Sequence, residues 1–191
     1  MNGNLAYLED WREELIGGKL VAMSPRPAFN HNRISSNIFR IFANYLDKKK
    51  CEAIADGTDL FLSETDWFIP DFMVVCDRDK IQMDGVHGAP DLVVEVLSPS
   101  TAQNDRGHKK EVYAKCGVRE YWIVSPDNKS VEIYLNEDAE LVFHKVYTVV
   151  PGWMLEKMKD EERAEVVTRF RCSLYDDLEL SLDDIFNGLL I

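Results

Sequence analysis

The chain has 191 residues, 46% of them hydrophobic, and this length and composition suit one compact domain spanning residues 1–191. It contains no apolar run of about 18 residues, so we expect no membrane span, and Met1 to Asp10 lack the basic and apolar regions of a signal peptide. The net charge of −12 argues against a simple nucleic-acid-binding protein, because such proteins usually carry a basic surface.

The cysteines are far apart in the sequence and form no CxxC pair. Without an export signal, we expect a cytoplasmic protein with four reduced thiols and no zinc site. The residues concerned are Cys51, Cys76, Cys116 and Cys172.

The first half of the chain predicts a short strand, a long helix and several strands. Residues 15–23 indicate a turn that leads into a strand. Between residues 30 and 50 the apolar positions recur in steps of three and four, which predicts an amphipathic helix with Asn30 as its N-cap. Strands are expected at 52–55, 59–62 and 67–76, and a polar loop at 77–90.

The second half begins with the run Asp91–Leu97, whose β-branched residues predict a strand buried on both faces. A helix at 101–116, ended by Gly117, and a strand at 120–124 complete a βαβ unit. The pattern predicts a mixed α/β fold, with a central mixed sheet flanked by helices. A hairpin is expected at 130–135 and 141–148, and residues 170–190 are expected to pack back on the body.

Two carboxylates interrupt otherwise apolar strands. Glu95 lies in the middle of the buried run, where a charge must be paired, hydrogen-bonded or bound to a metal. Asp71 follows Pro70 in a second apolar strand, and two acids on neighbouring core strands can converge on one Mg²⁺ ion. The structural alternatives are a Glu95 that a Lys, Arg or Tyr satisfies and an Asp71 that belongs to a turn.

The helix that follows adds a lysine. Asp105, Lys109 and Tyr113 share one helical stripe, from which Lys109 could reach the carboxylates. The alternatives are a surface pair between Asp105 and Lys109, and Lys110 as the functional lysine. Residues 106–115 hold four basic residues against one acid, which predicts a local positive face on an acidic protein.

Other polar residues are weaker candidates. Asp91 shares a strand face with Glu95, although we favour a role in starting the strand and capping local backbone. His31 could approach the site from the start of the first helix, but a capping or surface role is favoured. His108 and Lys110 are candidates for phosphate contacts.

Taken together, these residues resemble the Uma2 (DUF820) family, a branch of the PD-(D/E)xK nuclease superfamily. The resemblance covers residues 10 to about 150, and its specific part is the block 89–126. The stretch Glu14-Leu-Ile-Gly-Gly-Lys-Leu-Val21, followed by His31, is similar to the start of the family. The matching segments are Pro70-Asp71, Ala89 to Thr101 (APDLVVEVLSPST), Asp105, Lys109, Tyr113, and Gly117 to Pro126 (GVREYWIVSP).

The resemblance implies a restriction-endonuclease-like core in which Asp71 is the aspartate of the PD motif and Glu95 the acid of (D/E)xK. The motif lysine would stand where this chain has Leu97, and Lys109 matches the lysine that replaces it. The family implies that Asp71, Glu95 and the carbonyl of Val96 hold Mg²⁺ or Mn²⁺. Lys109 would then orient the attacking water and offset negative charge.

The function implied is a metal-dependent endonuclease that hydrolyses phosphodiester bonds in DNA. Superfamily analogy also implies a homodimer, with the hairpin or the C-terminal segment as the contact. Two alternatives explain the acidity of the chain. One is a nuclease-like binding or assembly module with little catalysis, and the other is a phosphodiesterase that acts on a phosphate ester other than DNA.

Overall fold

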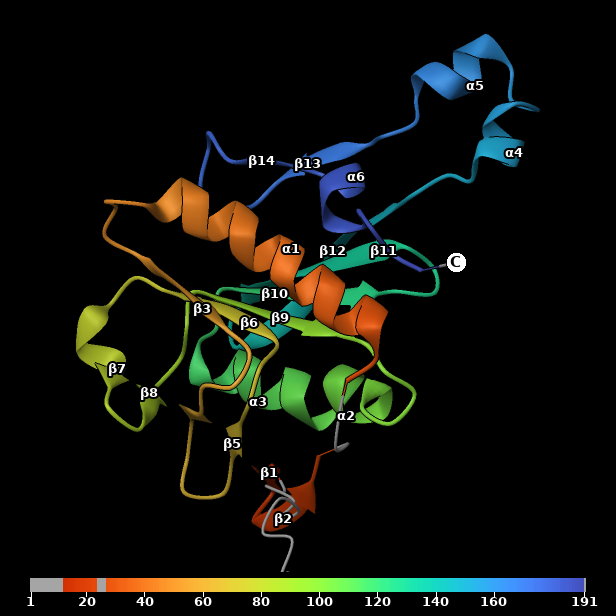
Figure 1. Cartoon of the computed structure of the whole chain (residues 1–191). Coiled ribbons are helices and arrows are strands. Elements are labelled where there is room, and N and C mark those ends of the chain that lie inside the picture. The colour runs from red at the N-terminus through yellow and green to blue at the C-terminus, as the bar shows by residue number, and fades with distance from the viewer. Residues whose placement is uncertain (1–11, 24–26, 191) are drawn as a thin grey trace, which may run out of the picture.

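A six-stranded mixed sheet forms the centre of the computed structural model, which describes residues 12–23 and 27–190 (Figure 1). Its strand order is β12-β11-β10-β9-β6-β3. β9 and β10 run parallel, as the predicted βαβ unit requires, and the other neighbouring strands are antiparallel. The strands are β3 (Glu52–Ala55), β6 (Phe72–Val75), β9 (Leu92–Val96), β10 (Glu120–Ser125), β11 (Ser130–Glu137) and β12 (Glu140–Thr148).

Helices cover both faces of this sheet. In Figure 1, α1 (Phe29–Leu46) lies on one face, and α2 (Ala102–Arg106) and α3 (His108–Cys116) lie on the other. Because side chains alternate along a strand, β9 supplies both cores: Val94 packs with the α1 layer and Val93 with the α3 layer. The predicted mixed α/β fold with a flanked central sheet is confirmed.

A second six-stranded sheet, of short strands from the N-terminal half, has the order β2-β1-β5-β4-β8-β7. The prediction of a single strand at 67–76 is wrong. This segment is divided around Pro70, which lacks a backbone N–H donor, into β5 (Trp67–Phe68) and β6. These two strands belong to different sheets. The loop expected at 77–90 instead contains a 3₁₀ turn (Arg78–Lys80), β7 and β8. The strands are β1 (Glu13–Ile16), β2 (Lys19–Ala22), β4 (Leu60–Phe61), β5 (Trp67–Phe68), β7 (Ile81–Gln82) and β8 (Gly85–His87).

The helix boundaries also differ from expectation. Ala28 is the N-cap of α1, and the Asn30 side chain bonds the backbone of Leu190 instead of capping the helix. The helix ends at Leu46, and Lys48 beyond it adopts a left-handed conformation with φ of 61°. The helix expected at 101–116 is broken at Gly107, whose φ and ψ of −108° and −107° are not helical.

The C-terminal region packs back on the α1 layer, as expected. Phe170, Leu182 and Ile185 are buried in the core that α1 shares with the central sheet. The hairpin strands β13 (Arg169–Arg171) and β14 (Glu179–Ser181) and helix α6 (Leu182–Ile185) form this region, whereas α4 (Gly152–Leu155) and α5 (Asp160–Ala164) extend away from the body (Figure 1). Within residues 12–23 and 27–190, no helix has the length and apolarity needed to cross a bilayer.

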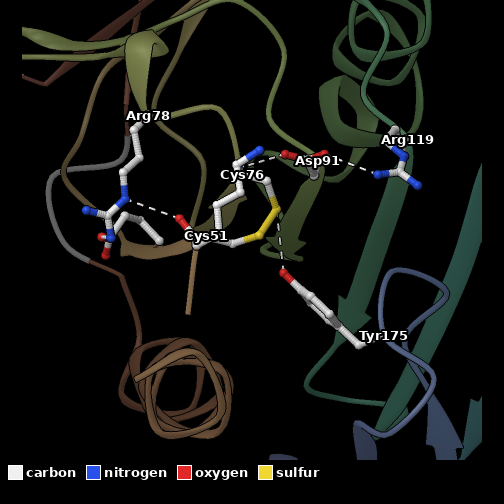
Figure 2. Close-up of a disulfide and its surroundings, with 8 residues drawn as sticks. Cys51, Cys76, Arg78, Asp91, Arg119 and Tyr175 are labelled. Carbon is white, nitrogen blue, oxygen red and sulfur yellow. Dashed lines mark hydrogen bonds and ion pairs between the residues drawn. A yellow bond between two sulfur atoms is a disulfide. The ribbon is translucent and has the colours of Figure 1, made fainter. Parts of the chain in front are cut away.

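A disulfide joins Cys51 to Cys76 where β3 and β6 meet (Figure 2). The antiparallel register pairs Glu52 with Val75, so the two cysteines face each other one step further along. The expectation of four reduced thiols is therefore wrong, because the strand pairing that aligns residues 25 apart is not visible in cysteine spacing.

We expect this disulfide to stabilise the fold by about 3 kcal/mol, because closing a loop of about 25 residues restricts the unfolded chain. The double variant Cys51→Ser/Cys76→Ser should lose about that amount in urea unfolding, and a thiol reductant should destabilise only the wild type. Alkylation of unfolded, non-reduced protein should label Cys116 and Cys172 alone, the two free cysteines. Labelling of all four cysteines would contradict the bond.

Candidate active site

The central sheet brings the two predicted carboxylates together. The register of β6 and β9 pairs Phe72 with Val94, so Asp71 and Glu95 lie opposite each other one step further along. Both side chains are buried, and both line a pocket of about 280 Å³ together with Lys109 and His31. Two acids 24 positions apart therefore meet because of strand pairing.

Lys109 projects from the start of α3 into the same pocket, and only 3% of its surface is exposed. Its Nζ lies 3.2 Å from Glu95 Oε1, 2.7 Å from Glu14 Oε1 and 3.7 Å from Asp105 Oδ1. Burial alone would lower the pKa of Lys109, but these carboxylates outweigh burial and raise it. A surface pair of Lys109 with Asp105 is wrong, because both side chains are buried, and the raised pKa of Lys109 favours its protonated form.

Glu14 is a site residue that the sequence interpretation missed. It lies on β1 and is 5% exposed, and its Oε1 also accepts the backbone N–H of Ile69 at 2.9 Å. The neighbouring Glu13 is exposed, as strand alternation requires. The only signal was its position in the segment that resembles the start of the family, because a short polar strand does not reveal which of two glutamates points inward.

Glu95 accepts hydrogen bonds from the Tyr113 hydroxyl at 2.7 Å and from Lys109. The structural alternative for Glu95, a buried carboxylate satisfied by a Lys, Arg or Tyr, expected hydrogen bonds of this kind. Both end on Oε1, and no hydrogen bond among the described residues reaches Oε2. Burial, with further contributions from nearby acids, raises the pKa of Glu95 well above its ordinary value although Lys109 opposes the shift. A second cation at this site would favour the ionised carboxylate.

Asp105 is the least compensated acid of the group. It is 1% exposed, and within the described part of the chain neither carboxylate oxygen has a hydrogen-bond partner. Burial raises its pKa to about 6, and Lys109 only partly opposes this effect.

This shift predicts a pH dependence of stability. Because the folded pKa of Asp105 lies above the ordinary 3.8, the folded protein holds the proton more tightly, so this group favours folding below pH 4 and its contribution is lost as the pH rises through about 6. We expect a loss of about 3 kcal/mol between these limits. In the Asp105→Asn variant, the free energy of unfolding measured with urea should fall less between pH 4 and pH 7 than it does in the wild type. Parallel pH profiles for the variant and the wild type would contradict the assignment.

His31 reaches the site from the first turn of α1, so the favoured capping or surface role is wrong. Its Nε2 lies 3.2 Å from Asp71 Oδ2, which also accepts the backbone N–H of Val96 at 2.7 Å. Burial lowers the pKa of His31, but the bond to Asp71 and the charges of Asp71 and Asp56 raise it overall.

Three weaker candidates lie elsewhere. Asp91 Oδ2 accepts the Cys76 N–H at 2.8 Å, and Oδ1 lies 3.3 Å from Arg119, which confirms the structural role favoured for it (Figure 2). Lys110 lies over the Tyr134 ring, with its Nζ 4.1 Å from the ring centroid. His108 bonds Asp66 at 2.6 Å.

The positive face expected at residues 106–115 is largely neutralised. Arg106 makes two hydrogen bonds to Glu132, at 2.7 and 2.9 Å, and Lys115 lies 3.7 Å from Glu111. Lys109 is buried among carboxylates. Glu111 is the one acid inside the segment, whereas the partners of Arg106 and Lys109 lie outside it, so a count of charges along the segment could not reveal them.

The donor set fits a divalent cation held by few protein ligands. Within residues 12–23 and 27–190, no three His, Cys, Asp or Glu side chains form a ready-made metal cluster. Mg²⁺ commonly uses one or two carboxylates and keeps several waters, and the two predicted carboxylates of the pocket can supply that set. The surplus of buried negative charge also requires a cation or protons. The acids are Glu14, Asp71, Glu95 and Asp105, and the buried amine is Lys109.

The fold, with Glu95 on β9 and Asp71 immediately before the neighbouring strand β6, is that of a restriction-endonuclease-like α/β protein. The Uma2 family model, described as "Putative restriction endonuclease", matches residues 5–160, and the chain belongs to this family. The resemblance seen in the sequence is therefore confirmed.

A solved structure agrees with this assignment, and two relatives are similar in sequence to this chain. A crystal structure described as a "putative nuclease belonging to DUF820", from Anabaena variabilis, superposes with a TM-score of 0.67 at 20% identity, covering 91% of this chain and 89% of that one. An uncharacterized protein of Synechocystis is 29% identical over 182 residues, 93% of this chain and 85% of its own. A second Synechocystis protein is 28% identical over 127 residues, 64% and 71% of the two chains.

Proposed function

We propose that this Uma2 protein is a metal-dependent endonuclease that hydrolyses phosphodiester bonds in DNA, with Mg²⁺ or Mn²⁺ as its cofactor. The observation that carries the proposal is the buried pocket in which Asp71 and Glu95 lie opposite each other beside a single lysine. Its surplus of negative charge suits a divalent cation, and the family description supports a nuclease.

The proposed metal ligands are Asp71, Glu95 and the Val96 carbonyl. When bound, the metal would acidify a water molecule and stabilise negative charge on the phosphate. The Val96 N–H orients Asp71, and the Tyr113 hydroxyl orients Glu95. Lys109, whose raised pKa keeps it protonated, donates hydrogen bonds that position the attacking water and offset charge on the phosphate. It takes the role of the motif lysine that Leu97 cannot fill.

The paired state of the basic residues favours a second candidate, a phosphodiesterase that acts on a small phosphate ester. Arg12, which lines the pocket, makes two hydrogen bonds to Asp56, and Arg106 is held by Glu132. Binding of a DNA duplex relies on cations that are free to neutralise phosphates. The pocket of about 280 Å³ is also small, close to the lower end of the roughly 300–1,000 Å³ typical of ligand sites.

The metal site is tested by titration calorimetry with Mn²⁺ and Mg²⁺. Glu95→Gln keeps an acceptor for Tyr113 and Lys109 but loses the charge, so we expect metal affinity to fall at least about tenfold. Glu120→Gln is the matched control: Glu120 is fully buried on the neighbouring strand, where it bonds Trp122 and Ser173 outside the pocket. It should keep wild-type affinity. Equal affinity in the wild type and Glu95→Gln would contradict the catalytic proposal and favour a binding or assembly module.

The two substrate classes are separated by salt dependence. If DNA is the substrate, fluorescence anisotropy with a short duplex should show that log affinity falls steeply with log salt, with a slope of about 0.9 per neutralised phosphate. Hydrolysis of bis(p-nitrophenyl) phosphate without measurable duplex binding would instead support the small ester. Neither duplex binding nor hydrolysis of either substrate would contradict both.

A further inference from the structure

An ion pair between Arg12 and Asp56 lies at the edge of the active-site pocket. The register of β3 and β6 pairs Ala55 with Phe72, so Asp56 lies opposite Asp71 one step further along. Asp56 and Asp71 both line the pocket of about 280 Å³, and Arg12, which directly precedes β1, lines it as well. Strand pairing therefore places this ion pair beside the proposed metal ligands.

The Arg12 guanidinium is held by one partner and keeps further donors. Its Nη1 and Nη2 donate to the two carboxylate oxygens of Asp56 at 3.2 and 2.6 Å. A guanidinium carries five N–H donors, and the remaining three, including Nε–H, make no other hydrogen bond among the described residues. Nε–H and a neighbouring Nη–H form a second fork, whose planar geometry matches two oxygens of a phosphate group.

Arg12 and Lys109 both line the pocket, but they differ in their access to a ligand. Lys109 is only 3% exposed and lies among carboxylates, whereas the Arg12 side chain is 38% exposed. The hydrogen bond to Asp56 raises the pKa of Arg12, although burial opposes the shift. The charge of Asp71 adds to the increase. Arg12 is therefore a protonated group that is accessible and lies within electrostatic reach of the site.

We propose that Arg12 binds the phosphate group on which the enzyme acts, through the donors that Asp56 leaves unused, and that Asp56 positions the guanidinium for this contact. The inference rests on the proposed function, because it concerns the substrate of the same pocket. A phosphate that enters a pocket rich in carboxylates is repelled unless a cation faces it. One arginine suits one phosphate group, which is the chemistry shared by a small phosphodiester and a single position of a DNA strand.

The test is the steady-state hydrolysis of bis(p-nitrophenyl) phosphate by the full-length protein with Mn²⁺. Arg12→Gln should lower kcat/KM at least about tenfold, because charge-assisted hydrogen bonds to the phosphate are lost. Arg12→Lys keeps the charge but loses the fork, so its kcat/KM should lie between those of Arg12→Gln and the wild type. Arg106→Gln is the matched control, since Arg106 makes an equivalent pair of hydrogen bonds to Glu132 outside this pocket. It should keep the wild-type kcat/KM.

Two further measurements separate phosphate binding from a structural role. Arg12→Gln should bind Mn²⁺ at least as tightly as the wild type in calorimetry, because it removes a cation and no proposed metal ligand. Inorganic phosphate, followed by ³¹P NMR in the presence of Mg²⁺, should bind Arg12→Gln at least about tenfold more weakly than it binds the wild type or Arg106→Gln.

The possible failures are distinguishable. Unchanged phosphate affinity in Arg12→Gln would overturn the role of Arg12, and hydrolysis that still depends on Glu95 would leave the proposed function standing. Loss of Mn²⁺ binding by Arg12→Gln would also overturn that role, because the arginine would then support the metal site or the fold. A wild type that binds phosphate through Arg12 but hydrolyses neither DNA nor the small ester would overturn the proposed function alone. A wild type that neither binds phosphate nor hydrolyses either substrate would overturn both.

Discussion

The burial of Lys109 among Glu14, Glu95 and Asp105 is the interaction on which the site depends. One ammonium group lies within 3.7 Å of three carboxylates that come from β1, β9 and α2. It connects the small N-terminal sheet, the central sheet and the helix layer at one point. A buried amine of this kind is tolerated only because several acids surround it, and removing one partner would leave an uncompensated charge.

The same interaction leaves the pocket short of positive charge. Lys109 compensates only part of the buried acid, and Asp71 is oriented by Val96 and His31 instead of by the lysine. Charge in a pocket of this kind is balanced either by protons, which the raised pKa values of Glu95 and Asp105 indicate, or by a cation. Metal binding and proton release are therefore expected to be coupled.

Local sequence patterns predicted most helices and strands. The features that they did not predict depend mainly on pairing between strands that are distant in the sequence. Periodicity located α1 and β9, and an acid in an apolar run pointed to Glu95. The second sheet, the Cys51–Cys76 bond and the buried position of Glu14 depend on strand registers that composition and spacing do not carry. The apolar pattern predicted one strand at 67–76 and one helix at 101–116, but the strand is divided around Pro70 and the helix at Gly107. At such positions the backbone constraints of the residue outweigh the hydrophobic periodicity.

The central claim is that Asp71 and Glu95 share a divalent cation in this pocket. It is tested most directly by crystals grown with Mn²⁺ and anomalous diffraction data collected at the manganese edge. The account predicts an anomalous peak within bonding distance of both carboxylates, at about 2.0–2.3 Å from their oxygens. Saturating Mn²⁺ with no peak in the pocket, or with peaks only at surface carboxylates, would contradict it.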